Sequence, residues 1–263
     1  MGNNLDIARS GNSLSDVAFK KTKIPAMKKS QRALVIGASS GIGREMALWL
    51  AKNDWHVAAV ARRENLLQEL CAEFPNCMLA NFFDANATET IAENLEEIVK
   101  QLGGMDLLVI SAGTGFLNPE LNLPLEQSTI KTNVDGFTAI ANWGYHYFKT
   151  QGSGQIAAIT SVGGLLSTPH GPAYNASKAY QINYLDSLRK KAKKECPAVT
   201  VTELRPGSVR TAMMKGEGHF WITSPSDAAT IACQAILKKK RLQYISKRWK
   251  FIGVLLRMVS LWR

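Results

Sequence analysis

From Ala33 onward, short apolar runs alternate with longer segments in which apolar residues recur at helical spacing. The runs are continuous, which is typical of strands buried on both faces of a parallel sheet. The predicted strands cover residues 33–36, 56–60, 77–83, 106–111, 155–160, 199–205 and 242–245. The predicted helices lie near residues 43–52, 63–74, 86–102, 124–151, 174–194 and 225–240. Such alternation predicts an α/β fold, a doubly wound parallel sheet of about seven strands with helices on both faces.

The domain organisation follows from the same pattern. The chain has no internal repeat and no low-complexity linker, and its 263 residues suit one large α/β domain. We therefore predict a flexible N-terminal arm over residues 1–31, a single domain over 32–245 and a basic amphipathic helix over 246–263.

The net charge of +11 is concentrated at the two ends of the chain. Residues 1–32 hold seven basic and two acidic residues, and residues 238–263 hold nine basic residues and no acidic one. The part between them is faintly acidic, with 16 basic and 19 acidic residues. A nucleic-acid-binding body would need a basic patch of its own, so this charge map argues against that function class. Basic ends suit a solvated tail or attraction to an anionic membrane.

Cysteine usage and the lack of a targeting pattern both indicate a cytoplasmic chain. The four cysteines are scattered without a C-x-x-C pair, so we expect reduced thiols, no metal site and a cytoplasmic chain. Residues 1–32 contain no apolar run of secretory-signal length, and the chain has no stretch of 18 apolar residues. A peripheral contact with the inner face of a membrane is the one further expectation.

That contact would come from residues 246–263. On a helix, Ser246, Lys250, Gly253, Arg257 and Ser260 form one narrow polar stripe, and large apolar residues cover most of the remainder. The pattern predicts an interfacial helix whose removal leaves cofactor binding intact. An oligomer contact, or docking onto the protein's own substrate pocket, would explain the same pattern.

A glycine-rich loop joins the first predicted strand to the helix that follows. It reads Gly37-Ala38-Ser39-Ser40-Gly41-Ile42-Gly43. Glycines at such a turn let backbone N–H groups approach a pyrophosphate, with the positive end of the helix dipole behind them. The position of the loop therefore predicts a dinucleotide site.

The end of the second predicted strand indicates which dinucleotide binds. An acidic residue there would bind the ribose 2′-hydroxyl of NAD, whereas an arginine accepts the 2′-phosphate of NADP. This chain has Arg62 and Arg63 at that point and no acid, and Arg44 adds a cation after the last glycine. We predict NADP(H) as the cofactor.

Tyr174 and Lys178 lie four residues apart on a predicted helix and so share one face. A tyrosine has a pKa of roughly 10, which is too high for acid–base chemistry at neutral pH. A lysine cation one turn away, together with the nicotinamide cation of a bound oxidised cofactor, favours the phenolate and lowers that pKa. Ser161, at the end of the fifth predicted strand, can hold a substrate carbonyl toward the phenol.

Five motifs in order resemble those of the short-chain dehydrogenase/reductase family, over roughly residues 32–245. They are the loop 37–43, Ser111-Ala112-Gly113, Asn133 in KTNVDG, Ser161 with the Tyr174/Lys178 pair, and Pro206-Gly207 followed by Val209 and Thr211. Asp84 resembles the residue that meets the adenine. Two positions depart from the family pattern: Ile36 stands where Thr is frequent, and Ser111 replaces the usual Asn.

The resemblance implies a Rossmann-like domain that transfers hydride between NADP(H) and a carbonyl or secondary alcohol. Tyr174 would protonate the carbonyl oxygen and Ser161 would polarise the carbonyl. Lys178 would lower the pKa of Tyr174 and hold the nicotinamide ribose. Asn133 would fix a water that links Lys178 to solvent. The cofactor would also contact Ala112, Gly113, Pro206, Gly207, Val209 and Thr211.

Two questions stay open at this point. A non-catalytic dinucleotide-binding sensor or membrane-associated scaffold would have the same fold, although intact catalytic positions favour an enzyme. Met213-Met214 and Phe220-Trp221 fall where the family has its variable lid, and as a lid they would indicate an apolar or lipid-like substrate. We also expect a homodimer or homotetramer.

Overall fold

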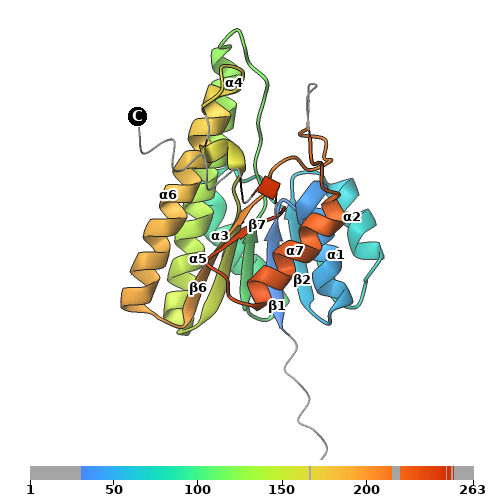
Figure 1. The fold of residues 1–263 in the computed structure, drawn as a ribbon. Helices are drawn as coiled ribbons and strands as arrows, with labels where there is room; N and C mark the ends of the chain where they lie inside the picture. Colours follow the sequence, from blue (N-terminus) through green and yellow to red (C-terminus); the bar gives the residue numbers. More distant parts are fainter. Residues whose placement is uncertain (1–30, 166, 215–219, 247, 250, 252–263) are drawn as a thin grey trace, which may run out of the picture.

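The computed structural model describes residues 31–165, 167–214, 220–246, 248–249 and 251. Seven parallel strands form one sheet in the order β3-β2-β1-β4-β5-β6-β7 (Figure 1). The strands are β1 (Arg32–Ile36), β2 (His56–Ala61), β3 (Met78–Phe82), β4 (Leu107–Ile110), β5 (Gly154–Ile159), β6 (Val199–Arg205) and β7 (Leu242–Tyr244). The predicted doubly wound α/β fold, a Rossmann-like arrangement, is confirmed.

Helices cover both faces of the sheet (Figure 1). One face packs against α1 (Gly41–Lys52), α2 (Glu64–Ala72) and α7 (Pro225–Leu237). The opposite face packs against α3 (Ile91–Leu102), α5 (Phe137–Gln151) and α6 (Pro172–Glu195). Alternate residues of β1 enter the two cores, Val35 on the α1 side and Leu34 on the α3 side. Burial on both faces explains why the strands are continuous apolar runs.

The strand order reverses between β1 and β4, which are adjacent in the sheet although two strands separate them in sequence. Ile36 pairs with Ile110 at the carboxyl ends of these two strands. The chain leaves β1 and β4 in opposite directions, which opens a crevice beyond the strand ends. The glycine loop follows β1 directly at this crevice.

The predicted helix over residues 124–151 is interrupted. It consists of α4 (Leu123–Ile130), a π-helical segment η2 (Lys131–Gly136) and α5. The predicted helix near 86–102 begins as a single 3-10 turn, η1 (Thr88–Thr90), before α3. A second 3-10 turn, η3 (Val162–Leu165), follows β5.

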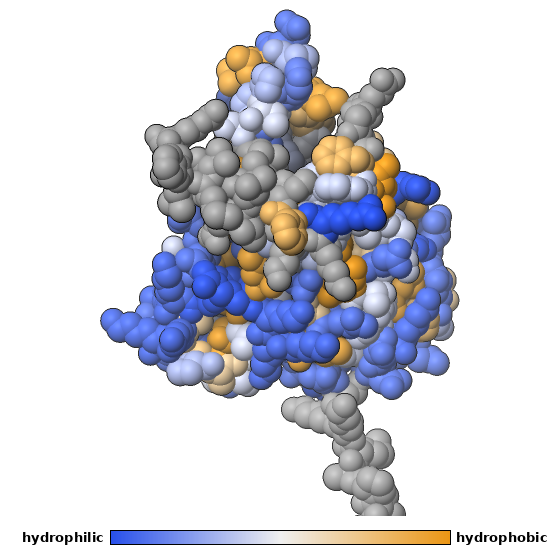
Figure 2. Space-filling model, viewed as in Figure 1, coloured by the Kyte–Doolittle hydropathy of each residue, from blue (hydrophilic) through white to orange (hydrophobic). Residues whose placement is uncertain are grey.

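The predicted N-terminal arm, apart from Gln31, and most of the predicted C-terminal helix lie outside the described residues. Within the described part of the chain, no helix combines the length and the apolarity needed to cross a membrane. Hydrophilic residues cover much of the visible surface, and apolar residues lie in patches between them (Figure 2).

Candidate active site

A cavity of about 650 Å³ lies at the carboxyl ends of the strands. It brings together most of the residues that the sequence pointed to. The predicted residues that line it are Gly37, Ser39, Ser40, Gly41, Ile42, Arg62, Arg63, Asp84, Ala112, Gly113, Ser161, Tyr174, Lys178, Pro206, Gly207, Val209 and Thr211. The glycine loop and the acid–base residues, more than 100 positions apart in sequence, therefore face one space.

The backbone of the glycine loop suits a close approach by a phosphate group. Gly37 and Gly41 have φ values of +93° and +59°, in the left-handed region that favours glycine. The side chain of Ser40, the N-cap of α1, makes no capping hydrogen bond. The first-turn N–H groups therefore stay available to an anion at the positive end of the helix.

Gly43 is needed for the packing of α1, and its predicted contact with the cofactor stays a prediction. It does not line the cavity. A Cβ atom on Gly43 would collide with the carbonyl oxygen of Gly37 and lie 2.7 Å from Oγ of Ser111. Glycine here permits α1 to pack closely against the end of β1. The small side chain of Ser111 occupies this tight space.

Of the three predicted arginines, two lie at the cavity and one does not. Arg63 donates to Oγ of Ser39 at 2.8 Å and to Oγ of Ser40 at 2.6 Å, which fixes its guanidinium over the glycine loop. Arg62 is exposed and also lines the cavity. Arg44 instead forms a 2.7 Å ion pair with Glu73 and does not line the cavity. Its role as a further cation near the phosphate stays a prediction.

The predicted catalytic pair, Tyr174 and Lys178, lies on α6, and Ser161 meets it from the turn after β5. Tyr174 and Ser161 form a hydrogen bond between their side chains. The Nζ atom of Lys178 lies 5.9 Å from the centroid of the Tyr174 ring. Oγ of Ser161 accepts the backbone N–H of Gly163 at 3.0 Å, which orients the hydroxyl. The three side chains therefore lie together at the cavity.

Burial governs the pKa values of this pair. It raises the pKa of Tyr174, which the hydrogen bond with Ser161 opposes. It also lowers the pKa of Lys178 to about 8, because the ammonium is only 5 % exposed. The expected lowering of the Tyr174 pKa is therefore not found in the protein chain itself, where desolvation of the phenolate outweighs the neighbouring groups.

Asn133 is fully buried in the π-helical segment η2 and does not line the cavity. Its side chain accepts the backbone N–H of Thr114 at 2.9 Å and donates to the carbonyl of Thr114 at 2.7 Å. It also donates to Oγ of Ser177 at 3.0 Å. The amide thus ties the loop after β4 to α6. π-Helical turns are frequent at functional sites because the extra residue redirects a side chain.

Gln181 is a site residue that sequence reasoning missed. Its side chain accepts from Nζ of Lys178 at 2.9 Å and donates to the main-chain carbonyl of Asn133 at 2.8 Å. This side chain links the main chain of Asn133 to the ammonium of Lys178. The water between Lys178 and solvent that the resemblance implies stays a prediction. The signal was its spacing, since Gln181 lies three residues after Lys178 and shares its helix face.

Two more missed residues position Tyr174. A Cβ atom on Gly115 would lie 2.5 Å from Cδ2 of Tyr174, so only glycine lets the ring pack there. Glu126, on α4, accepts the backbone N–H of Ala173 at 3.0 Å at the start of α6. A carboxylate is favourable at a helix N-terminus. Both contacts are long-range, so the local sequence gave no sign of them.

The segment after β6 is covered by the C-terminal part of the chain. Trp249 is 8 % exposed, lines the cavity and packs so closely on Gly207 that any Cβ there would collide with the indole. It stacks on Phe220 with a centroid distance of 5.3 Å, and Trp221 packs edge-on at 5.9 Å. Met213 and Met214 line the cavity beside this cluster. His170 lines it too, although it is exposed.

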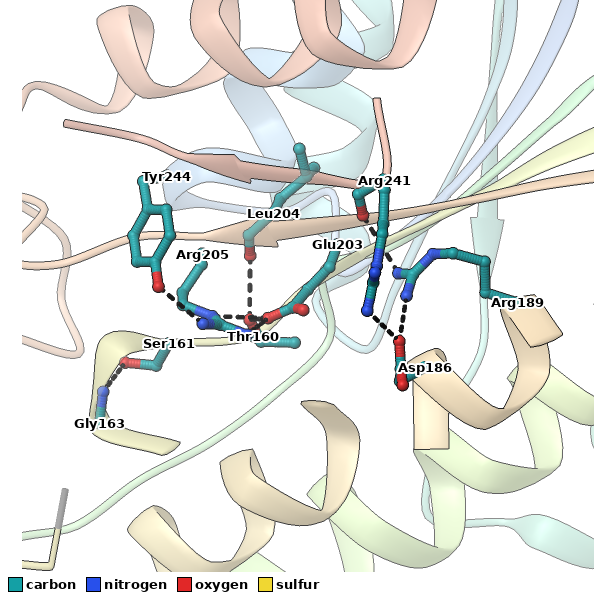
Figure 3. A network of polar contacts seen from close by, with 10 residues as sticks. All are labelled: Thr160, Ser161, Gly163, Asp186, Arg189, Glu203, Leu204, Arg205, Arg241 and Tyr244. Carbon is teal, nitrogen blue, oxygen red and sulfur yellow. Dashed lines mark hydrogen bonds and ion pairs between the residues drawn. The ribbon is translucent and has the colours of Figure 1, made fainter. Parts of the chain in front are cut away.

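A polar network supports the strand that precedes Ser161 (Figure 3). Oγ1 of Thr160 donates to Oε1 of Glu203 at 2.9 Å. Arg205 forms a buried 2.6 Å ion pair with the same oxygen and donates to the hydroxyl of Tyr244 at 2.8 Å. The network joins the end of β5 to β6 and β7 next to Ser161. Among the residues described, no cluster of three or more His, Cys, Asp or Glu side chains could hold a metal ion.

Comparison with known proteins places this geometry in context. A family model described as short chain dehydrogenase matches residues 31–220. A Myxococcus xanthus protein described as an uncharacterized oxidoreductase is 32 % identical over 186 residues, which cover 69 % of this chain and 73 % of that protein.

Solved structures are similar in fold at lower identity. A Burkholderia phymatum short chain dehydrogenase/reductase in complex with NAD has a TM-score of 0.79 at 19 % identity, covering 89 % of this chain and 95 % of that one. The structure of ElxO with NADP bound has a TM-score of 0.71 at 21 % identity, covering 82 % and 97 %.

Proposed function

Because this chain belongs to the short-chain dehydrogenase/reductase family, we propose that it is an NADP(H)-dependent oxidoreductase. It interconverts a carbonyl compound and a secondary alcohol. The observation that carries this proposal is the constellation of Tyr174, Ser161 and Lys178 in the cavity that also contains the glycine loop. A nucleotide-binding scaffold without chemistry would have no need for a half-buried phenol beside a buried ammonium.

The side chains divide the acid–base work. Burial raises the pKa of Tyr174, so the phenol keeps its proton at neutral pH and can donate it to a carbonyl oxygen. Ser161 accepts the N–H of Gly163, which leaves its own hydroxyl proton to polarise the same oxygen. When bound, the reduced cofactor supplies a hydride to the carbonyl carbon. The reverse reaction, oxidation of the alcohol, uses the same groups.

Lys178 holds the charge that this chemistry needs. Two of its three N–H donors are used, one toward the carbonyl of Ile159 at 3.1 Å and one toward Gln181. The third is free for a ribose hydroxyl or for Tyr174. A charge fixed in this way favours the phenolate when alcohol is oxidised.

The residues around the glycine loop suit a dinucleotide with a 2′-phosphate. Arg63 is held over the loop by Ser39 and Ser40, whose hydroxyl protons remain free to donate to phosphate oxygens. Arg62 adds a second guanidinium at the exposed edge of the cavity. This donor set, with no carboxylate at the end of β2, supports NADP(H) over NAD(H).

The lining of the other end of the cavity supports an apolar or lipid-like substrate. Phe116, Leu117, Met213, Met214 and Trp249 all line it. Leu117 and Met213 are also exposed, so the apolar lining continues to the rim. An apolar wall with a few convergent polar groups is the usual composition of a small-molecule site.

Loss of the phenol tests the mechanism. Tyr174→Phe should lower turnover at least 100-fold while NADPH binding and the melting temperature stay close to those of the parent, because only the proton donor is removed. Tyr180→Phe is the matched control, since Tyr180 is an exposed tyrosine of the same helix bonded to Thr138. Turnover of a panel of ketones, 3-oxoacyl esters and steroids is followed by NADPH absorbance. Equal turnover in the two variants would contradict the role of Tyr174 as proton donor, whereas no turnover of any compound by the parent protein would favour the non-catalytic sensor.

Cofactor choice is tested at the end of β2. Replacing Arg62 with Asp and Arg63 with Ile should narrow or invert the preference for NADPH over NADH in titrations of cofactor fluorescence, because the cations that face the 2′-phosphate are gone. Arg44→Met is the control, because Arg44 pairs with Glu73 outside the cavity and should leave the preference unchanged. Equal affinities for both cofactors in the parent protein would contradict the assignment.

Assembly and location form the remaining part of the proposal. We propose a domain over residues 32–245 that works as a homodimer or homotetramer in the cytoplasm. The basic and apolar sequence of residues 246–263 supports a peripheral contact with an anionic membrane, which would bring the apolar rim of the cavity close to lipid-like substrates.

A further inference from the structure

The side chain of Gln181 lies at the centre of the polar contacts behind the catalytic pair. It is 1 % exposed on α6. Oε1 accepts from the ammonium of Lys178 at 2.9 Å, and Nε2 donates to the main-chain oxygen of Asn133 at 2.8 Å. The orientation of the amide is fixed by chemistry, since an ammonium can only donate and a carbonyl can only accept.

Three fixed neighbours define the position of the Lys178 ammonium. Gln181 accepts one N–H from its own helix, and the carbonyl of Ile159 accepts another from β5 at 3.1 Å. A Cβ atom on Gly113, in the loop after β4, would lie 3.5 Å from Nζ, so the backbone there forms a wall. These contacts leave one N–H of Lys178 directed toward the cavity and Tyr174.

We propose that Gln181 is a positioning residue for the proton transfer, which fixes the Lys178 ammonium so that its charge acts on Tyr174. The inference rests on the proposed oxidoreductase function. Because Gln181 is anchored on Asn133, the π-helical segment η2 reaches the acid–base pair through this side chain. Asn133 therefore contacts the site in two ways. Its side-chain amide binds Thr114, and its main-chain oxygen holds the amide of Gln181, which in turn binds Lys178.

The effect on Tyr174 has a definite sign. An acceptor for the ammonium favours the charged form of Lys178, and that charge favours the phenolate of Tyr174. The described groups around the ammonium are Tyr174 and Gln181 from α6, the Ile159 carbonyl from β5 and Gly113 after β4, and of these only Tyr174 titrates. Without Gln181 the phenolate loses support, so its pKa rises.

Gln181→Met tests this, because methionine has a similar volume and makes neither hydrogen bond. For alcohol oxidation, the midpoint of the acidic limb of kcat/KM should move up by about one pH unit relative to the parent. Gln181→Glu should move this midpoint in the same direction, because the negative charge of its carboxylate offsets the effect of the ammonium on Tyr174. This variant keeps a polar side chain at the position, so it still tests the proposal if the methionine variant folds poorly. Thr129→Val is the control, since it removes a buried hydrogen bond to Leu125 that involves neither Lys178 nor Gln181.

A second readout does not depend on turnover. The ultraviolet absorbance of tyrosinate is titrated with pH in each variant, and the titration of the same variant carrying Tyr174→Phe is subtracted. An upward shift of the Tyr174 midpoint in both Gln181 variants, with none in Thr129→Val, supports the proposal. Unchanged midpoints in both Gln181 variants overturn it, whatever their stability. Absence of turnover in the parent protein would overturn the proposed function alone, because the absorbance titration would still decide the role of Gln181.

Discussion

Lys178 illustrates the conflict between stability and function at a single residue. The chemistry needs its charge next to Tyr174, but burial disfavours that charge and lowers the pKa of Lys178 to about 8. Among the described residues, the Ile159 carbonyl and Gln181 accept hydrogen bonds from the ammonium and replace part of its lost hydration. The folded state is therefore less stable at neutral pH than it would be with a neutral group that packed equally well.

This cost has a predictable pH dependence. The pKa of Lys178 is lower in the folded protein than its ordinary value of 10.5. Below about pH 8 both states bind the proton, but between there and 10.5 only the unfolded state does. The free energy of unfolding of the parent should therefore rise relative to Lys178→Met across this window, by up to roughly 3 kcal/mol. Urea unfolding of both proteins at several pH values measures the difference, and a constant difference would contradict the assignment.

The residues that could be predicted are defined by local spacing in the sequence, whereas those that were missed depend on contacts with distant parts of the chain. Tyr174, Lys178 and Ser161 were predictable because their spacing on a helix and at a strand end is local. Gly115 and Gln181 owe their roles to neighbours far away in sequence, such as Tyr174 for Gly115 and Asn133 for Gln181. For Arg44, the sequence indicated a cation near the loop but could not show that Glu73 pairs with it.

At the scale of elements, the strands were the easiest to predict. The predicted range 199–205 coincides with β6, and 33–36 differs from β1 by one residue, because burial on both faces leaves a continuous apolar run. The π-helical segment η2 was not predictable. Its sequence KTNVDG continues the helical pattern on both sides, and the wider turn is apparent only from the contacts of Asn133 with Thr114 and Ser177.

The polar network between β5, β6 and β7 leads to a prediction for this part of the sheet (Figure 3). Arg205 and Glu203 are 1 % and 4 % exposed, so removing one partner leaves a buried charge uncompensated. Arg205→Met should lower the free energy of unfolding by about 3–5 kcal/mol. Arg241→Met, which removes an exposed partner of Asp186, should cost about 1 kcal/mol or less.

Urea unfolding of these two variants tests whether burial, and not the number of ion pairs, determines their stability. The double variant Arg205→Met with Glu203→Gln should recover part of the lost free energy, because no charge is left unpaired. Equal losses in Arg205→Met and Arg241→Met would show that the network contributes no more than a surface pair.

At the scale of the whole molecule, the chain returns to its own active site after the sheet is complete. The sequence pattern suggested that Trp249 contacts a membrane as part of an interfacial helix. The structure instead buries Trp249 against Gly207, beside Phe220 and Trp221. Phe251, two residues later, is 86 % exposed. The start of the C-terminal segment therefore belongs to the cavity, which changes the expectation that its removal leaves cofactor binding intact.

Two variants separate the contribution of Trp249 from that of the residues after it. Truncation after Ile245 and the point variant Trp249→Ala both remove the indole that covers Gly207, so both should weaken NADPH or substrate binding by about tenfold, which corresponds to 1.4 kcal/mol. Only the truncation removes the basic and apolar residues beyond Trp249. In sedimentation with anionic vesicles at low salt, the parent and Trp249→Ala should therefore pellet with the vesicles, and the truncated chain should not. Added salt should release part of the bound protein, because salt screens only the electrostatic attraction. If Trp249→Ala binds cofactor and substrate like the parent, the indole has no part in the site. If vesicles retain none of the three proteins and truncation changes the mass seen by light scattering, the segment after Trp249 is a contact between subunits and the membrane proposal is wrong.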